Sequence, residues 1–342
     1  MKLHRGPAPQ NPQAQRRASM HDIGMWGPIG SGKTTFLAAL NIAAMRSQSR
    51  WKLVGTDDEA TDFLVDQTHS LVEERVFPPA TVAIKPFRWS LIGRAEVPAG
   101  RRWGREITEE VTLEVNLDLL DVGGGMFDRV PTTPARDGDE LGFGEEPDRD
   151  DDEVLFNHLA GQGGIVYLYD PVREADKGDA FRFFNRTLER LKQRSFEQRG
   201  FTDGYLPQHL AVCVTKFDHK TVYDRIRSRG LRSVDDTDEM LPRVRDEDAA
   251  EAFRELCSIT HDGGADLVRR AIENNFHPDR VAYFVTSAVG FHVGPSGRFM
   301  ERDFQNVVVG PDGKARIRGP VRPINVLEPV LWLAKRLAVK PR

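Results

Sequence analysis

Residues 27–34 carry the pattern with the clearest chemical meaning in this 342-residue chain. They read GPIGSGKT, which fits GxxxxGK[ST], with an apolar segment before the pattern and a helix-forming segment after it. The glycines let backbone amides curl around phosphate oxygens, and the amino end of the following helix adds a positive dipole. Lys33 would bring a point charge to the β- and γ-phosphates, and the Thr34 hydroxyl would ligate magnesium. The predicted phosphate-binding residues are Gly27, Pro28, Ile29, Gly30, Ser31, Gly32, Lys33, Thr34 and Thr35. The alternative interpretation is a glycine-rich turn with an incidental lysine.

A second candidate site follows the apolar run that ends at Asp121, where the sequence reads DVGG. A carboxylate at the carboxyl end of a strand beside a phosphate-binding loop can hold Mg²⁺, usually through water. Gly124 can bring its amide close to a γ-phosphate because it has no side chain in the way. Asp-x-Gly-Gly is also a common turn sequence, but its place after a phosphate-binding loop favours the functional interpretation.

Residues 215–218, TKFD, end another apolar run and could recognise a purine base. Asp218 can accept hydrogen bonds from both the ring N–H and the exocyclic amine of guanine, a pair of donors that adenine does not offer. The stem of Lys216 can lie over the purine face. Thr215 stands where Asn is commoner, and its hydroxyl can do part of the same tethering. After the next apolar run, the small residues Ser287 and Ala288 allow backbone amides to reach the guanine carbonyl oxygen.

These segments need secondary structure that brings them together, and the sequence supplies short apolar runs separated by helical stretches. Such runs are typical of a parallel sheet covered by helices on both faces. Strands are predicted at 21–26, 108–120, 164–169, 209–215 and 281–286, with another emerging from the loop within 76–92. Helices are predicted at 35–46, 153–160, 178–199, 248–273 and 325–339.

The order GPIGSGKT, DVGG, TKFD and TSA, each at a strand end, resembles the motif series of P-loop GTPases of the TRAFAC (Ras-like) class. The resemblance covers most of residues 20–340. It implies a three-layer α/β fold, with a mainly parallel sheet of about six strands and helices on both faces. It also implies GTP and GDP binding with Mg²⁺, and switching through two loops that sense the γ-phosphate. The sequences FPPAT at 77–81 and NVLEPVLWL at 325–333 are similar to bacterial GTPases of the double-GTPase group.

The resemblance also implies a switch threonine between the first helix and DVGG that binds magnesium and the γ-phosphate. Thr81 is the best candidate, because it lies in a loop just before a predicted strand, whereas Thr61 and Thr68 fall in a predicted helix. The predicted metal ligands are therefore Thr34, Thr81 and Asp121. The residues expected to act in phosphoryl transfer are Lys33, Thr34, Thr81 and Gly124.

One position departs from the family pattern. Many hydrolytic members carry Gln directly after DxxG to orient the attacking water, but this chain has Gly125. Slow hydrolysis of GTP, stimulated by a partner protein, is therefore the expected activity. Arg129 and His158 are close in sequence, but a solvated loop residue and a packed helix residue are the better interpretations of these two.

Composition excludes several other classes of protein. The 48 Lys and Arg against 52 Asp and Glu give a net charge of −4, so there is no overall basic field for nucleic acid. The two cysteines, Cys213 and Cys257, cannot build a disulfide framework or a four-ligand zinc site. No apolar stretch approaches the roughly 20 residues that span a bilayer. We therefore expect a cytoplasmic protein without an integral membrane segment.

The predicted organisation is a single G domain at 21–342 preceded by a disordered basic tail at 1–20. Two insertions are expected in the domain. The first, at 131–153, contains ten acidic residues between Asp137 and Glu153, opposed there only by Arg149, and should be mobile because like charges repel. The second, at 294–322, reads as a β-hairpin.

Three functions fit these observations. The leading hypothesis is a guanine-nucleotide switch that acts on a protein effector or responds to a GTPase-activating partner. A nucleotide-binding interaction module with negligible hydrolysis is the second, and Gly125 favours it. A P-loop ATPase or kinase is the third, and TKFD argues against it.

Overall fold

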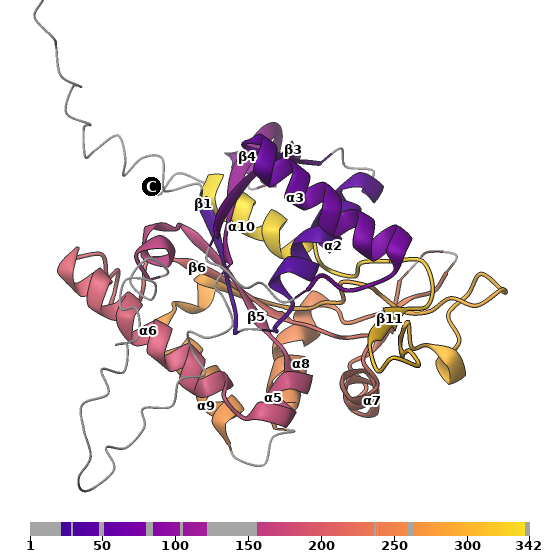
Figure 1. Ribbon diagram of the computed structural model, residues 1–342. Coiled ribbons are helices and arrows are strands. Elements are labelled where there is room, and N and C mark those ends of the chain that lie inside the picture. The colour runs from indigo at the N-terminus through magenta and orange to yellow at the C-terminus, as the bar shows by residue number, and fades with distance from the viewer. Residues whose placement is uncertain are drawn as a thin grey trace, which may run out of the picture.

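The computed structural model describes residues 22–28, 30–47, 51–79, 85–102, 105–121, 156–235, 237, 239–258 and 263–338. Its centre is a seven-stranded sheet (Figure 1). In spatial order the strands are β2 (Lys52–Gly55), β3 (Lys85–Arg102), β4 (Arg105–Asp121), β1 (Asp22–Trp26), β5 (Gly164–Tyr169), β6 (His209–Val214) and β9 (Val281–Val285).

The five strands from β4 to β9 run parallel, while β3 pairs antiparallel with β4, and β2 antiparallel with β3. Helices cover both faces of this sheet, so the fold is a three-layer α/β architecture with a mainly parallel sheet, consistent with the expected Ras-like arrangement. The predicted fold class is confirmed.

One face of the sheet is covered by α2 (Lys33–Arg46), α3 (Asp58–His69) and α10 (Glu328–Ala338), as Figure 1 shows. The other face is covered by α6 (Ala180–Glu197), α7 (Lys220–Ser228), α8 (Asp246–Cys257) and α9 (Gly264–Asn275), and residues 156–161 are also helical. The shorter elements are the π-helix η2 (Ser70–Glu74), α5 (Pro171–Lys177), the 3-10 helices η3 (Pro278–Arg280) and η4 (Glu301–Asp303), β7 (Ser233–Val234) and β8 (Pro242–Arg243).

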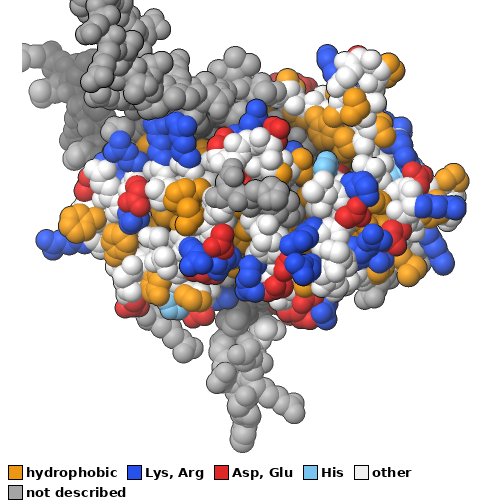
Figure 2. Space-filling model, turned by 90° about the horizontal axis from the view of Figure 1, so that it is seen from below, with side chains coloured by type: hydrophobic (Ala, Val, Ile, Leu, Met, Phe, Trp, Pro, Cys, Tyr) orange, Lys and Arg blue, Asp and Glu red, His pale blue; other side chains and the backbone are white. Residues whose placement is uncertain are grey.

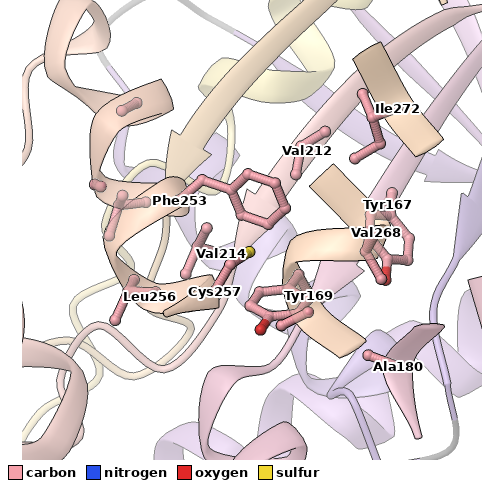
Figure 3. Packing of buried hydrophobic residues seen from close by; sticks show 14 of the residues in the cluster. Tyr167, Tyr169, Ala180, Val212, Val214, Phe253, Leu256, Cys257, Val268 and Ile272 are labelled. Carbon is pink, nitrogen blue, oxygen red and sulfur yellow. The ribbon is translucent and has the colours of Figure 1, made fainter. Parts of the chain in front are cut away.

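Strand β5 shows why the central strands read as continuous apolar runs. All six of its residues are buried, because both faces of the sheet are covered. Alternate side chains enter different cores, with Tyr167 and Tyr169 on one side and Val166 and Leu168 on the other. Figure 3 shows the two tyrosines packed against residues of β6, α8 and α9, among them Cys257. Burial in this apolar core raises the pKa of the Cys257 thiol to about 12, so this cysteine is a core residue.

The strand and helix predictions need several corrections, and the helices α5 and α7 were not predicted. β2 was not predicted, and it adds a seventh strand; it is four residues long and half exposed, too short for a clear periodic pattern. β3 and β4 form one long antiparallel pair that extends to Arg102 paired with Arg105, although Gly93 and Pro98 suggest a loop in the sequence. A register shift at Pro98/Gly100 lets the pairing continue. The predicted helix 248–273 is two helices, because the αL backbone at Gly263 (φ 68°) precedes α9.

The surface has mixed charge where Figure 2 shows it, with Lys and Arg side chains interspersed with Asp and Glu and with separate apolar groups. Many of these charges are paired: Arg269, for example, contacts both Asp266 and Glu273 on α9. Within the predicted insertion 294–322, β10 (Val307–Val309) and β11 (Ala315–Ile317) form an antiparallel pair. Across the described ranges, none of the helices combines the length and the apolar character that a bilayer crossing requires.

Candidate nucleotide-binding site

The loop between β1 and α2 has the shape of a phosphate cradle. Gly30 (φ 76°) and Gly32 (φ 93°) both have left-handed backbone, which side chains with a Cβ rarely adopt. Gly27 also has no room for a side chain, because an added Cβ would lie 2.6 Å from Ser31 Oγ and 3.0 Å from the carbonyl oxygen of Leu168. Sterics therefore select glycine at all three positions.

Helix α2 begins at Lys33 with its amino end open toward this loop. Its N-cap is Gly32, which provides no side-chain hydrogen bond, and its first turn has no acidic residue. The first turn therefore brings no negative charge against the helix dipole, which favours an anion at this end. Thr34 and Thr35 follow in the first turn, both half-buried.

The Lys33 ammonium is held inside the curve of the loop. It donates to the carbonyl oxygens of Gly27 (3.0 Å) and Pro28 (3.3 Å), and the residue is only 9% exposed. These two bonds fix the charge near the amides of the cradle, so little side-chain entropy would be lost on phosphate binding.

The other candidate segments reach the same edge of the sheet. β1, β5, β6 and β9 are parallel neighbours, and their paired residues include Trp26 with Tyr167, Tyr169 with Val214, and Val214 with Val285. The loops that follow these strands therefore lie side by side. The phosphate loop after β1 and the TKFD segment after β6 are separated by β5 alone, about 10 Å at the usual strand spacing.

Asp218, which the sequence predicts to recognise the base, is buried and held by a hydrogen bond. It is 7% exposed, and its Oδ1 accepts a hydrogen bond from Ser287 Oγ at the end of β9. Ser287 Oγ in turn accepts from the backbone N–H of Gly290 (2.8 Å). Burial raises the pKa of Asp218 to about 6, against the opposing effects of the Ser287 hydrogen bond and the Lys216 charge. Ala288 is half-buried and packs against the core beside α2 and α10.

Thr215 holds the loop after β6 to its neighbour β5. Its hydroxyl donates to the carbonyl oxygen of Tyr169 (3.2 Å), and its own N–H donates to the same oxygen (2.8 Å). The tethering predicted for this residue is therefore directed at β5.

The sequence reasoning missed Asp170, the residue that follows β5. Its carboxylate lies 2.6 Å from Lys216 Nζ, and its side chain is completely buried. It also caps α5, accepting from the backbone N–H groups of Val172 and Arg173. The signal was present in YLYDPV, because an Asp before Pro at the end of an apolar run is typical of a helix start at a strand end.

Asp121 is the last residue of β4, and its backbone lies beside the phosphate loop. Gly24 pairs with Asp118, and because the two strands are parallel, three further residues bring Asp121 level with Gly27. Thr34 and Asp121 would offer the hard oxygen donors that Mg²⁺ prefers. The described residues contain no group of three or more His, Cys, Asp or Glu arranged for a metal.

Several predicted residues and segments lie outside the part of the chain that the structure describes. They are Ile29, Thr81, Gly124, Gly125 and Arg129, and the segments 1–20 and 131–153.

His158 lies toward the other end of β1. Its ring is close to Asp118, Arg88 and Asp22, and burial lowers its pKa. Asp22 begins β1, whereas the phosphate loop begins five residues later, about 16 Å further along the strand. His158 is therefore a packed helix residue beside a polar cluster and not a residue of the phosphate site. Thr61 and Thr68 lie in α3, as predicted.

Comparisons with known proteins give no family assignment. No family model matches the chain, and no curated protein matches it. Among solved structures, the signal recognition particle receptor SRb-GTP/SRX complex from Chaetomium thermophilum matches with 12% identity and a TM-score of 0.31, over 80% of this chain and 92% of that one. A bacterial selenocysteine-specific elongation factor, EF-Sec, matches with 13% identity and a TM-score of 0.27, over 78% of this chain and 25% of that one. A protein from Thermus thermophilus matches with 15% identity and a TM-score of 0.24, over 79% of this chain and 38% of that one. The present chain thus spans well under two thirds of the second and third structures, and all three TM-scores are below 0.5.

Proposed function

We propose that this protein is a guanine-nucleotide switch of the P-loop GTPase kind, which binds GTP and GDP with Mg²⁺ and hydrolyses GTP slowly. One observation carries the proposal: the Lys33 loop and the braced Asp218 carboxylate lie at the same edge of the sheet, one strand apart. A nucleoside triphosphate has an anionic end and a purine end separated by a ribose, and this edge offers a partner for each.

The phosphate end would be bound by the loop amides, the α2 dipole and the Lys33 ammonium. The purine end would meet Asp218, whose two carboxylate oxygens suit the neighbouring N–H groups of guanine and would face no matching pair on adenine. Thr34, Asp121 and Thr81 would hold Mg²⁺, which neutralises phosphate charge when it is bound. The Gly124 amide would contact the γ-phosphate.

Slow hydrolysis follows from the residue after DVGG. Gly125 has no side chain to orient water, so a partner protein would have to supply the missing group. The same residue supports a second candidate function, a nucleotide-dependent interaction module without significant hydrolysis. The two candidates share the binding site and differ only in turnover.

Nucleotide competition tests the binding proposal. The purified protein with Mg²⁺ is loaded with fluorescent GDP, which is then displaced by GTP, GDP or ATP. We expect GTP and GDP to displace the probe and ATP to fail at a thousandfold higher concentration, because a site built for paired hydrogen bonds rejects a ligand lacking them by about 10⁴-fold. Equal displacement by ATP would contradict the guanine assignment.

Single-turnover hydrolysis of GTP separates the two candidates. The wild-type protein is compared with Lys33→Ala, and with Lys335→Ala, which removes an exposed lysine of α10, as the matched control. Turnover that is present in wild type and control and absent in Lys33→Ala supports the enzyme. No turnover in wild type, alone or with cell extract, supports the interaction module.

A further inference from the structure

The two oxygens of the Asp170 carboxylate have separate partners. Oδ1 accepts from the N–H groups of Val172 and Arg173, both at 3.0 Å, and so caps α5. Oδ2 lies 2.6 Å from the ammonium of Lys216. Asp57, the cap of α3, accepts from the Ala60 N–H in the same way, and it forms no ion pair with any of the described residues. Asp57 is exposed, whereas the Asp170 side chain is completely buried, so Asp170 needs a counter-charge and Lys216 supplies it.

Lys216 is itself unusual. Its backbone is left-handed (φ 59°), a conformation that is costly for a residue with a Cβ, and its side chain is 42% exposed. An exposed lysine would ordinarily leave its ammonium in water and keep its rotamer freedom. Here the head is fixed on a completely buried carboxylate, so the four-carbon stem has both of its ends held.

The strand order gives the direction of that stem. Lys216 follows β6, Asp170 follows β5, and β5 lies between β6 and the strand that leads into the phosphate loop. The stem of Lys216 therefore runs from the purine end of the site toward the phosphate end. This is the direction in which a bound nucleotide would extend from Asp218 to Lys33.

We propose that Asp170 is a positioning residue of the purine site, which anchors the Lys216 ammonium so that the lysine stem forms a fixed apolar platform under the purine ring. The inference rests on the proposed function. Asp170 increases the affinity for a purine nucleotide by holding Lys216 in place, whereas Asp218 determines which base is preferred.

Electrostatics supports the pairing. Asp170 is one of the charges that raise the pKa of Asp218, and Lys216 is one that lowers it. An unpaired Asp170 would place a second buried negative charge near the base-reading carboxylate. Lys216 opposes that repulsion, and the pKa of Asp218 stays at about 6, so Asp218 remains mostly ionised at neutral pH.

Asp170→Asn tests the ion pair separately from the cap, since the amide oxygen can still accept from Val172 and Arg173 while Lys216 loses its anionic partner. We expect GDP and GTP affinities to fall together by about tenfold, because the ion pair that fixes the lysine head is lost. The ratio of GTP to ITP affinity stays unchanged, because ITP lacks only the amine that Asp218 reads. Asp57→Asn is the matched control and keeps wild-type affinity.

Two lysine variants complete the experiment. Lys216→Met keeps an apolar stem without the ammonium and should lose about tenfold in affinity, with no further loss when it is combined with Asp170→Asn. Lys216→Arg keeps a partner for Asp170 and should stay within about threefold of wild type. Because Lys216 is partly exposed, these variants carry the test even if Asp170→Asn fails to fold.

Wild-type affinity in Asp170→Asn or Lys216→Met overturns the inference, and so does an additive loss in the double variant, since the two residues would then act independently. An altered GTP to ITP ratio in Asp170→Asn also overturns it. Failure of the wild-type protein to bind any guanine nucleotide refutes the proposed function instead, and that result is available before any variant is made.

Discussion

The phosphate half and the purine half of the candidate site are built in different ways. In the phosphate half, Lys33 bonds to carbonyl oxygens five and six residues earlier, within one strand–loop–helix unit. In the purine half, Asp218 is braced by Ser287, which is 69 residues away in sequence. The contacts of the phosphate half are local, so they form wherever the 27–34 loop and its helix fold. Those of the purine half exist only when β5, β6 and β9 are assembled, so the purine half should depend more strongly on the integrity of the whole domain.

The largest expected effect lies in the purine half. Asp218→Asn places an amide NH₂ toward the guanine N–H donors, and we expect GTP affinity to fall by about 10³-fold with preference passing to xanthine nucleotides. The measurement is competition of GTP and XTP for a fluorescent nucleotide. Asp279→Asn, on a residue whose side chain is 84% exposed, is the control. An unchanged base preference in Asp218→Asn would remove this carboxylate from the purine site and break the comparison.

A pair of glycines compares the stability of the two halves. An added Cβ at Gly290, which also has φ 69°, would overlap the carbonyl oxygen of Arg322, whereas at Gly27 the first obstacle is the Ser31 hydroxyl. We expect Gly290→Ala to lower the free energy of unfolding by about 3 kcal/mol, because the Arg322 carbonyl oxygen would lie only 2.0 Å from the added Cβ. We expect a smaller loss of about 1 kcal/mol for Gly27→Ala, because the Ser31 hydroxyl can rotate away and the Leu168 carbonyl oxygen lies at 3.0 Å. Urea unfolding measures both. Equal losses would mean that the purine loops adapt as easily as the phosphate loop.

The smallest expected effect is the pH dependence of GDP affinity. Asp218 must be ionised to accept two hydrogen bonds from guanine, and its pKa is raised to about 6. GDP affinity should therefore fall by up to about tenfold for each pH unit below 6. The phosphates of GDP titrate in the same range, so the effect is the difference between wild type and Asp218→Asn, which keeps only the phosphate contribution. Identical pH profiles for the two proteins would show that Asp218 does not titrate as proposed.

The raised pKa of Asp218 also determines how the stability of the ligand-free protein changes with pH. The pKa of Asp218 in the folded protein lies above its ordinary value of 3.8, so between about pH 4 and 6 the folded state holds a proton that the unfolded state has released. The contribution of Asp218 to the free energy of unfolding therefore decreases as pH rises through this window. Bound guanine nucleotide would reverse this tendency, because it favours the ionised carboxylate.

The sequence predicted the fold class correctly, and the residues of the candidate site that the structure describes follow neighbouring strands at one edge of the sheet. Buried parallel strands such as β5 and β6 produce continuous apolar runs that are readable without a structure. It missed β2, whose four residues alternate between exposed and half-buried and acquire strand structure only by pairing with β3. It also joined α8 and α9 into one helix, because both segments have the apolar spacing of an amphipathic helix.

The sequence by itself determined the phosphate loop, because its geometry depends on glycines and a lysine within eight consecutive residues, where steric limits on φ leave few alternatives. It also placed Asp218 and Ser287 at strand ends. Only the tertiary structure decided that these two side chains bond to each other and that Asp170 holds Lys216. Such contacts depend on strand order and register, which are set by the packing of both cores and not by any local pattern.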